Sequence, residues 1–423
     1  MKKKFILIVI VIFVLVSLSS IFIVSKLNNV GNLPKYQQNL WSKSFNIFMD
    51  LPDVIKSTFM IFTGKRNFSN LFNDYNVKFL PQTQYIDLKF HKKKIKFNKS
   101  SRYTFYIEQY NKGLIFVTKN GEFFRSDFQD LSSDSNNLNV EKIDIKNLEK
   151  ENEQNVKILD TLVIDNKIYI SKMSVYKNCK TLEIKFKEID DTLNFKSFKL
   201  FDECALIGIG AGRIQEYTFN NNRGILLSTT DSDNDDPGKR AQDDNSIFGK
   251  IVFINLNTKE YEIFSKGHRN VQGLFVKNEI ILSTEHGPKG GDEINRILYK
   301  KNYGWPIASY GNPYENDNLL YKKSHYENNF EEPTFVFLPS IGISELIILP
   351  NSFDSNWMDN ALVASLNGRS IYRMKFQSPK FEKILYSEKI YIGERIRDIK
   401  FIEKSNLILL ALERTGSLGI LRK

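Results

Sequence analysis

The sequence predicts an all-β chain whose strands form a six-bladed β-propeller. From about residue 100 onward, short runs rich in β-branched and aromatic residues alternate with turns of Asn, Gly and Asp. The runs repeat one order: a strand, a polar turn, a second apolar strand ending in Ser or Thr, a loop and a third strand. Copies of this unit cover residues 103–127, 159–176, 213–232, 271–287, 344–374 and 396–423.

The number of units favours a propeller over other all-β folds. One unit alone buries too little apolar surface, whereas six units stacked radially share a core and leave few exposed strand edges. No helical periodicity of useful length occurs after residue 85. We expect the propeller to span residues 86–423, and a pair of β-sandwiches is the alternative.

The beginning of the chain predicts a membrane anchor. Three lysines, Lys2 to Lys4, precede an uncharged run at 5–25 that is long enough to span a bilayer. The prediction is a cytoplasmic tip at 1–4, a transmembrane anchor at 5–25 and a tether at 26–85 that could be partly helical. The rest of the chain would then lie outside the cell membrane, in the periplasm. A long signal peptide that is cleaved is the alternative.

Composition is globular, and the charge is basic. The 423 residues are 41% hydrophobic and 26% charged, with a net charge of +11. Part of the excess is the run "HKKKIKFNK" at 91–99. Apolar residues alternate with these lysines, at Leu88, Phe90, Ile95 and Phe97. We interpret the run as a strand with a solvated face. No motif that reads RNA or DNA is present, so no nucleic-acid partner is expected.

Neither the cysteines nor the acidic residues form a metal motif. Cys179 and Cys204 are the only cysteines; they could pair in an exported protein or remain two buried thiols, and both possibilities stay open. The run "DSDNDD" at 231–236 begins like a calcium loop but lacks its glycine, and Gln242 stands where the closing Glu is required. We interpret it as a solvated acidic loop.

Motifs in the second half of the chain carry the functional signal. The stretch "ILSTEHGPKGGDEIN" at 281–295 places carboxylates and an imidazole around three glycines and a proline, at the end of a predicted strand. The accompanying motifs are "GAGRI" at 210–214, "AQDDNSIFGKI" at 241–251, "GHRNVQGL" at 267–274, "KNYGWP" at 301–306, "LPSIGIS" at 338–344, "ALVASLNGRSIYRM" at 361–374 and "GERIRDI" at 393–399.

In order and spacing these motifs resemble the soluble pyrroloquinoline quinone (PQQ)-dependent sugar dehydrogenases, the glucose/sorbosone dehydrogenase family. The likeness is greatest to its aldose sugar dehydrogenase branch. It is strong over about residues 205–423, weak over 100–200 and absent before that. The resemblance implies a propeller that uses PQQ and Ca²⁺ to oxidise an aldose sugar at its anomeric carbon.

The resemblance also implies which residues form the site. PQQ is a flat tricarboxylate, so it needs cations for its carboxylates and a hard metal at its quinone oxygen. Arg269 would polarise the quinone as a catalytic residue. The cofactor-binding positions correspond to Arg269, Asn270, His286, Asn367, Arg369, Arg395 and Arg397. The metal positions correspond to Gly287 and Pro288 for the calcium at the cofactor, and to Glu293 and Tyr303 for a second, structural calcium.

The chain departs from the family at two places. Ile209 stands at the position of the catalytic histidine, four residues before Arg213, and isoleucine cannot take a proton from a sugar hydroxyl. A positioned base contributes about 10²–10⁴-fold to rate. Asn367 stands where a lysine is expected, and Arg369, predicted on the same strand face, could replace its charge. Asp202 and Glu203 could replace the histidine only if their loop were rearranged.

Three functions are therefore considered. The first is a membrane-tethered PQQ- and Ca²⁺-dependent aldose dehydrogenase that passes electrons to a membrane acceptor. The second is a catalytically lapsed propeller that binds a sugar or a protein, for which Ile209 is the main support. The third, a calcium-assisted hydrolase or lactonase, rests on analogy with other propellers alone.

Overall fold

The computed structural model describes the larger part of the chain beyond residue 77. The described residues are 78–79, 86–98, 103–111, 113–133, 135–148, 157–176, 179–205, 210–231, 239–313, 324–377 and 379–423. The chain divides into two compact units, Met1–Leu71 and Phe72–Lys423. The predicted tip at 1–4, the anchor at 5–25 and nearly all of the tether at 26–85 lie outside the described residues.

The predicted localisation, a single-pass cell-membrane protein with most of the chain in the periplasm, is corrected by the structure. In the described ranges, no helix has the length and apolar character needed to cross a bilayer. The α-helices there, α4 (Gln129–Ser132) and α5 (Lys239–Gln242), have four residues each, whereas a span needs about 20. The 3-10 helices are η3 (Tyr326–Asn328), η4 (Ser355–Trp357) and η5 (Glu403–Ser405).

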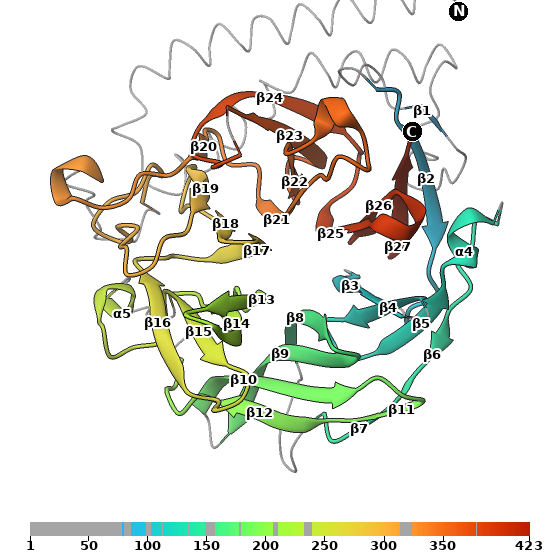
Figure 1. The fold of residues 1–423 in the computed structure, drawn as a ribbon, viewed down its shortest axis with the longest axis horizontal. Helices are drawn as coiled ribbons and strands as arrows, with labels where there is room; N and C mark the ends of the chain where they lie inside the picture. The colour runs from blue at the N-terminus through green and yellow to red at the C-terminus, as the bar shows by residue number, and fades with distance from the viewer. Residues whose placement is uncertain are drawn as a thin grey trace, which may run out of the picture. The chain divides into compact units, whose positions relative to one another are not determined.

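Six antiparallel sheets surround a central axis, which confirms the six-bladed propeller (Figure 1). Each predicted unit supplies one blade. Blade 1 contains β3 (Phe105–Tyr110), β4 (Gly113–Thr118), β5 (Phe123–Asp127) and β6 (Glu141–Lys142). Blade 2 contains β8 (Lys157–Ile164), β9 (Lys167–Tyr176), β10 (Cys179–Glu188) and β12 (Lys196–Leu200). Blade 3 contains β13 (Ile214–Phe219), β14 (Asn222–Ser228), β15 (Lys250–Asn255) and β16 (Tyr261–Lys266).

The other three blades repeat the pattern. Blade 4 contains β17 (Val271–Lys277), β18 (Ile280–Glu285), β19 (Asp292–Arg296) and β20 (Phe335–Phe337). Blade 5 contains β21 (Ile343–Ile348), β22 (Ala361–Ser365), β23 (Ser370–Phe376) and β24 (Ile384–Tyr391). Blade 6 contains β25 (Ile396–Ile402), β26 (Leu407–Leu412) and β27 (Ser417–Arg422). Outside the blades, β7 (Asp144–Lys146) and β11 (Thr192–Asn194) pair in parallel.

The two ends of the described chain close the ring. Strand β2 (Lys89–Lys94) is the fourth strand of blade 6 and pairs antiparallel with β27, from Lys89 opposite Arg422 to Lys94 opposite Ser417. Strand β1 (Lys78–Phe79) pairs with the outer edge of β2. The sheet therefore begins within the range that was predicted to be a tether.

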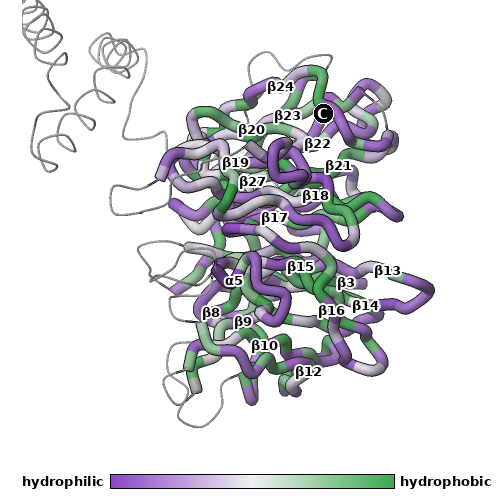
Figure 2. Tube along the Cα trace, turned by 90° about the vertical axis from the view of Figure 1, so that its left-hand side faces the viewer, coloured by the Kyte–Doolittle hydropathy of each residue, from purple (hydrophilic) through white to green (hydrophobic). Residues whose placement is uncertain are grey.

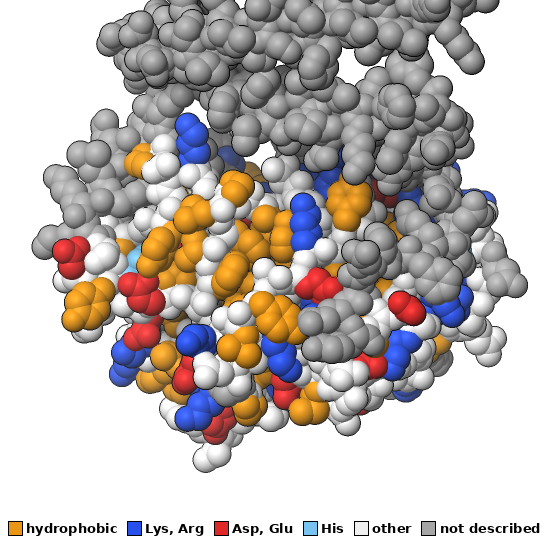
Figure 3. All heavy atoms as spheres, turned by 90° about the horizontal axis from the view of Figure 1, so that it is seen from above, with side chains coloured by type: hydrophobic (Ala, Val, Ile, Leu, Met, Phe, Trp, Pro, Cys, Tyr) orange, Lys and Arg blue, Asp and Glu red, His pale blue; other side chains and the backbone are white. Residues whose placement is uncertain are grey.

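The basic run at 91–99 does form a strand, but its predicted solvated face is wrong for two lysines. Lys92 is buried and its Nζ lies 2.7 Å from Glu394 Oε1. Lys93 is also buried, and its Nζ donates to the carbonyl oxygens of Asp130 and Ser133 at 2.8 and 2.6 Å. The two ammonium groups therefore have partners inside blade 6 or at its contact with α4, and they do not face solvent. On the face shown in Figure 3, Lys and Arg side chains alternate with Asp and Glu around apolar ones.

The apolar core is divided among the contacts between blades. Six buried hydrophobic clusters occur in the described residues, and each combines side chains from two neighbouring blades. Between blades 1 and 2, for example, Ile115 of β4 packs in one cluster with Ile168 of β9. Hydrophobic stretches within the strands alternate with hydrophilic ones along the trace, as Figure 2 shows. Burial of both sheet faces therefore requires the closed ring.

The buried Arg213 of blade 3 lies at the axis and contacts the other five blades. Its Nη1 lies 2.9 Å from Asp160 Oδ1 of blade 2 and 3.3 Å from Glu345 Oε2 of blade 5. Its Nε donates to the Gln272 carbonyl of blade 4 at 2.6 Å, and its Nη2 donates to the Arg397 carbonyl of blade 6 at 3.1 Å. The guanidinium also lies over the Tyr106 ring of blade 1, 5.1 Å from its centroid.

Buried carboxylates join inner strands of neighbouring blades by accepting backbone N–H groups. Asp160 accepts from Ile214 N at 2.9 Å, and Asp398 accepts from Ile107 N at 2.8 Å. Glu345 accepts from Leu274 N at 3.1 Å. Because each bond crosses from one blade to the next, these acids fix the relative height of the inner strands.

Cys179 and Cys204 form a disulfide, which settles the alternative that the sequence left open. Cys179 begins β10, and Cys204 follows β12. A backbone hydrogen bond lies beside the link, from Ala205 N to the Lys180 carbonyl at 2.7 Å. The disulfide therefore ties the segment that leaves blade 2 to its sheet.

Candidate functional site

One end of the propeller, called the site face below, carries the predicted site residues that the structure describes. The six units repeat the same strand order around the axis, so their inner strands begin at the same end. Arg269 and Asn270 precede β17, and Arg395 precedes β25. Antiparallel pairing places the end of a second strand beside the start of the first, as Glu285 lies opposite Val271.

Arg269 joins the start of β17 to the turn that follows β18. Its Nη1 donates to the carbonyl oxygens of His286 and Gly287, each at 3.0 Å. The guanidinium lies over the Trp305 ring, 5.2 Å from its centroid. A cation is thus held at the Gly-Pro turn by two carbonyls and one aromatic face.

The turn at 287–291 brings several carbonyl groups together. A Cβ at Gly287 would collide with the carbonyl oxygens of Gly290 and Gly291, whose φ angles are 95° and 68°. Glycine is therefore required at 287 by the close approach, and it is favoured at 290 and 291 by the positive φ. Pro288 is buried beside Gly311. Backbone carbonyls are ligands that Ca²⁺ accepts, and the Gly287 oxygen has a second lone pair beyond its bond from Arg269.

Arg395 and Arg397 converge on one carboxylate, Glu413. Arg395 Nε donates to Glu413 Oε2 at 3.0 Å, and Arg397 Nε donates to Oε1 at 2.8 Å. Burial raises the pKa of Glu413, but the two arginines and the Thr104 hydroxyl outweigh it and lower that pKa to about 2. Two positive charges therefore face one fixed negative charge, which leaves the pair net cationic.

A hydrogen-bonded path connects this pair to the start of β17. Arg397 Nη1 donates to Gln272 Oε1 at 3.0 Å, and Gln272 Nε2 donates to Asn270 Oδ1 at 2.8 Å. Asn270, Gln272 and Arg397 belong to blades 4 and 6, so the path crosses the axis. These contacts therefore join Asn270, Arg395 and Arg397, which the resemblance assigned to the cofactor, into one group.

Lys157 adds to the positive charge at the site face, and no sequence motif singled it out. It begins β8, and burial, followed by repulsion from Lys119, Arg397 and Lys180, lowers its pKa to about 8. Its neighbour Ile158 donates its N–H to the Lys119 carbonyl at 2.9 Å. A lysine whose proton is weakened by other cations marks a place where an anion is favoured.

His286, predicted to bind the cofactor, is held by the backbone. Its Nε2 lies 2.7 Å from the Ile343 carbonyl, which requires a proton on that nitrogen. Its backbone N–H donates to the Asn270 carbonyl at 3.0 Å. Burial lowers the pKa of His286, so the neutral ring is favoured.

Glu285 and His268 support Arg269, and neither residue was predicted to belong to the site. Glu285 Oε1 accepts from the backbone N–H of Arg269, and from that of Asn270 at 3.2 Å. Glu285 Oε2 lies 3.1 Å from His268 Nδ1, and His268 Nε2 lies 2.8 Å from Ser265 Oγ. A signal was available, because Glu285 is a charged residue at the end of an apolar strand.

Glu293 lies opposite Glu285 in the β18–β19 pair, in a buried polar cluster. Burial, then Glu285, raises the pKa of Glu293 to about 8. Asn295 donates to Glu293 Oε2 at 3.3 Å, but its own Oδ1 has no hydrogen-bond partner in the described part of the chain. The same holds for Ser283 Oγ, on the residue opposite Asn295. Two facing carboxylates and two unsatisfied oxygens form a donor set that suits a hard cation.

Tyr303 contributes its ring rather than its hydroxyl to this region. The hydroxyl donates to the Arg296 carbonyl at 2.5 Å and accepts from Leu298 N at 2.9 Å. Its ring stacks on His268 with centroids 4.7 Å apart. A small cavity, about the size of one water molecule or ion, lies among these groups. Its lining includes Arg269, Glu285, His286, Gly287, Glu293, Tyr303 and Trp305.

Asn367 and Arg369 lie on the site face in the turn between β22 and β23. The sequence predicted that they share a strand face, and this is wrong, because both residues precede β23. Arg369 has a left-handed φ of 49°, and its carbonyl accepts from Ile392 N at 3.1 Å. Both side chains are exposed.

The position of the missing base, Ile209, lies outside the described residues. Of the two replacements considered, Glu203 is engaged elsewhere: Ser246 Oγ donates to its Oε1 at 2.7 Å and Ile247 N to its Oε2 at 2.8 Å. Asp202 is exposed. Asp231, interpreted from sequence as part of a solvated loop, instead accepts from the Trp305 indole Nε1 at 2.8 Å. That acid lies on the site face.

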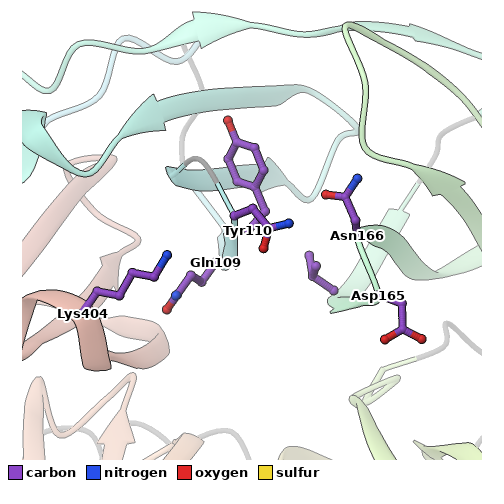
Figure 4. Close-up of a pocket in the computed structure, with 7 residues that line it drawn as sticks. Gln109, Tyr110, Asp165, Asn166 and Lys404 are labelled. Atoms are coloured by element: carbon purple, nitrogen blue, oxygen red, sulfur yellow. The ribbon is translucent and has the colours of Figure 1, made fainter.

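A second pocket lies at the opposite end of the inner strands. It is lined by the end of β3 and by the β8–β9 turn, with Gln109, Tyr110, Asp165, Asn166 and Lys404 around it (Figure 4). None of the predicted site residues lines it. In the described residues there is also no group of three His, Cys, Asp or Glu side chains that could hold a metal ion.

Comparisons with known proteins show what this chain is similar to. The chain is 28% identical over 214 residues to the aldose sugar dehydrogenase YliI of Escherichia coli (strain K12), a match that covers 46% of this chain and 56% of YliI. The chain spans about half the length of the curated relatives that it matches.

Solved structures share the fold at low sequence identity. The soluble aldose sugar dehydrogenase from E. coli in the apo-form superposes with a TM-score of 0.62 at 19% identity, covering 78% of this chain and 98% of that one. The PQQ-bound aldose sugar dehydrogenase from Streptomyces coelicolor gives 0.56 at 15% identity, covering 82% and 99%.

The family model described as Glucose / Sorbosone dehydrogenase matches residues 210–421, which is half of the chain. This match contains blades 3 to 6 except β2, and with them Arg213, Arg269, the turn at 287–291 and the Arg395–Arg397 pair. The chain therefore belongs to the glucose/sorbosone dehydrogenase family.

Proposed function

We propose that this chain oxidises an aldose sugar at its anomeric carbon, with PQQ as cofactor and Ca²⁺ as the cofactor's metal. The observation that carries the proposal is that the guanidinium groups of Arg269, Arg395 and Arg397 and the carbonyl-rich turn at 287–291 lie on one face. Membership of the family and the fold shared with the PQQ-bound aldose sugar dehydrogenase from Streptomyces support PQQ as the cofactor.

The charges on the site face fit a tricarboxylate. Arg395 and Arg397 share the single acid Glu413, so they retain net positive charge for a further carboxylate. Lys157 lies within the field of Arg397. Guanidinium groups bind carboxylates in a bidentate way, which would fix the orientation of a flat ligand.

Calcium has two candidate positions. The carbonyl of Gly287 and its neighbours in the turn would hold the ion at the cofactor. The cluster of Glu285, Glu293, Asn295 and Ser283 would hold a structural ion, which would remove the repulsion between the two acids. The ring of Tyr303 would then form one side of this calcium site.

When bound, PQQ would supply the two-electron acceptor for the hydride of the sugar. This chain's part is to stabilise the negative charge that then develops on the quinone oxygens, for which Arg269 is placed beside the turn. Glu285 and Trp305 hold Arg269 by its backbone and by its guanidinium face.

A catalytically lapsed propeller is the second candidate, and Ile209 favours it. Such a protein would keep the cationic face and bind PQQ, a sugar or a protein without turnover. The two candidates differ in one measurable property, electron transfer from an aldose to the bound quinone.

The test uses the full chain with added PQQ and Ca²⁺. We expect the absorbance of PQQ to change on binding and a redox dye to be reduced when aldoses are added. Arg397→Gln should weaken PQQ binding by about tenfold or more, since a charged hydrogen bond is worth roughly 1.5–3 kcal/mol. Arg223→Gln, which removes an exposed arginine paired with Asp165, is the matched control and should leave binding unchanged. PQQ binding without dye reduction would favour the lapsed propeller. The absence of PQQ binding would refute the dehydrogenase and would also exclude PQQ as a ligand of a lapsed propeller.

A further inference from the structure

The proposed reaction needs a proton acceptor, and the family's own position cannot supply one. Ile209 has a hydrocarbon side chain at the place of the family's histidine. A replacement must be an ionisable side chain on the site face, close to Arg269. Asp231 is such a group.

Asp231 is fixed to both Arg269 and Trp305. Its backbone N–H donates to the Arg269 carbonyl at 2.8 Å. Its Oδ2 accepts from Trp305 Nε1 at 2.8 Å. The guanidinium of Arg269 lies over the ring of the same tryptophan. The indole therefore holds a carboxylate at its N–H edge and a guanidinium on its face, so the two charged groups lie beside one ring.

The chain next to the family's base position packs against the residues next to Asp231. A Cβ on Gly210, which follows Ile209, would lie 3.0 Å from Asn270 Oδ1 and 3.8 Å from Thr230 Oγ1. Thr230 directly precedes Asp231, forms an isolated bridge with Asn270 and donates through its hydroxyl to the Arg269 carbonyl at 3.0 Å. Asp231 thus belongs to the neighbourhood that borders Gly210.

We propose that Asp231 accepts the proton of the sugar's anomeric hydroxyl, in place of the family's histidine; this proposal rests on the proposed function. The anomeric C–H bond breaks and its electron pair leaves with the hydrogen to the quinone, which gains two electrons. The O–H bond breaks and its proton goes to the Asp231 carboxylate, while the C–O bond becomes the carbonyl of a lactone. Trp305 is a positioning residue, because its N–H fixes the base as the third group of a catalytic triad does.

The decisive variant is Asp231→Asn in the full chain with PQQ and Ca²⁺. Asparagine keeps the size and an oxygen for the Trp305 N–H but cannot take the proton. We expect PQQ affinity, measured by absorbance titration, to stay within about twofold, and kcat to fall by about 10²–10⁴-fold with KM little changed. The acidic limb of the pH profile of kcat/KM should disappear. Asp231→Glu should restore part of kcat.

Two controls separate chemistry from structure. Asp244→Asn removes an exposed acid that pairs with Lys266, and it should leave binding and turnover unchanged. Trp305→Phe keeps the ring under Arg269 but loses the N–H, so kcat should fall while the acidic limb remains.

The outcomes are distinguishable. If wild type binds PQQ and turns over but Asp231→Asn keeps kcat within about threefold, the assignment of Asp231 is overturned and the proposed function stands. If wild type binds PQQ without turnover, or does not bind it, the proposed function fails and the assignment falls with it. A fall in kcat together with lost PQQ affinity would show a structural role and would also overturn the assignment.

Discussion

Arg213 offers the sharpest test of how the propeller is held together. We consider Arg213→Met, which keeps an apolar stem at the axis and removes the charge. Three carboxylates lie within 4 Å of Nη1: Asp160 at 2.9 Å, Glu345 at 3.3 Å and Asp398 at 3.9 Å. All are almost fully buried, so water cannot replace the guanidinium.

The magnitude follows from the unpaired acids rather than from the ion pairs themselves. At an effective dielectric constant of 20, each contact is worth about 4 kcal/mol before desolvation, which cancels much of that gain. Removing only the cation leaves buried carboxylates without compensation, which costs about 3–5 kcal/mol. We therefore expect the free energy of unfolding to fall by about 3–5 kcal/mol near pH 8.5.

The cost should depend on pH in a defined direction. Burial raises the pKa of Glu345 to about 8, against the attraction of Arg213. A raised carboxyl pKa in the folded state means that stability is lost as pH rises from about 4.5 to about 8. This loss should be steeper in Arg213→Met. Near pH 5.5, where Glu345 is protonated, the mutation should cost less by about 1 kcal/mol or more.

Denaturant unfolding followed by tryptophan fluorescence at the two pH values measures both quantities. Glu345→Gln should be less harmful in the Arg213→Met background than in wild type, because it removes an acid that has lost its cation. A cost below about 1 kcal/mol, or one equal at both pH values, would refute the idea that Arg213 compensates the axial acids.

Three further predictions follow from the described contacts. Replacing Cys179 and Cys204 together by serine should lower the free energy of unfolding by about 3 kcal/mol, since the disulfide closes a loop of 25 residues, and denaturant titration would detect it; no change under non-reducing conditions would contradict this. Calcium should bind more tightly as pH rises through about 8, the pKa of Glu293, because the ion competes with the proton on that carboxyl group. In Glu293→Gln, the calcium affinity measured by isothermal titration calorimetry should no longer depend on pH in this range. The Arg395–Arg397–Glu413 cluster should stabilise the fold above about pH 4.5 and lose this contribution as pH falls toward about 2, so Glu413→Gln should flatten the acid limb of a thermal melting profile, and an unchanged limb would argue against the contact.

The repeat pattern allowed the fold to be predicted because the strands of each blade are formed by residues that lie close together in the sequence. A strand, a turn and a second strand need only neighbouring residues, so apolar spacing and turn residues mark them. The sequence also predicted that the turn at Gly287 follows the end of an apolar strand, and in the structure this turn follows β18.

Contacts between distant blades could not be predicted from the sequence. Nothing local indicates that Glu413 lies between Arg395 and Arg397, or that Lys92 and Lys93 are buried in the blade that closes the ring. In the sequence, Arg213 marks only the position of the missing histidine, whereas in the structure it contacts five other blades. Such side chains have partners that depend on ring closure, which a linear pattern does not encode.

The pairing of β2 with β27 has a consequence for synthesis. Strand β2 is made early, but the strand beside it is among the last residues of the chain. Until β27 has been made, β2 and β26 each have an edge whose backbone groups lack the partners that β27 supplies. We therefore expect the nascent propeller to be prone to self-association until β27 has been made, and a polypeptide that stops before β27 to keep an open ring.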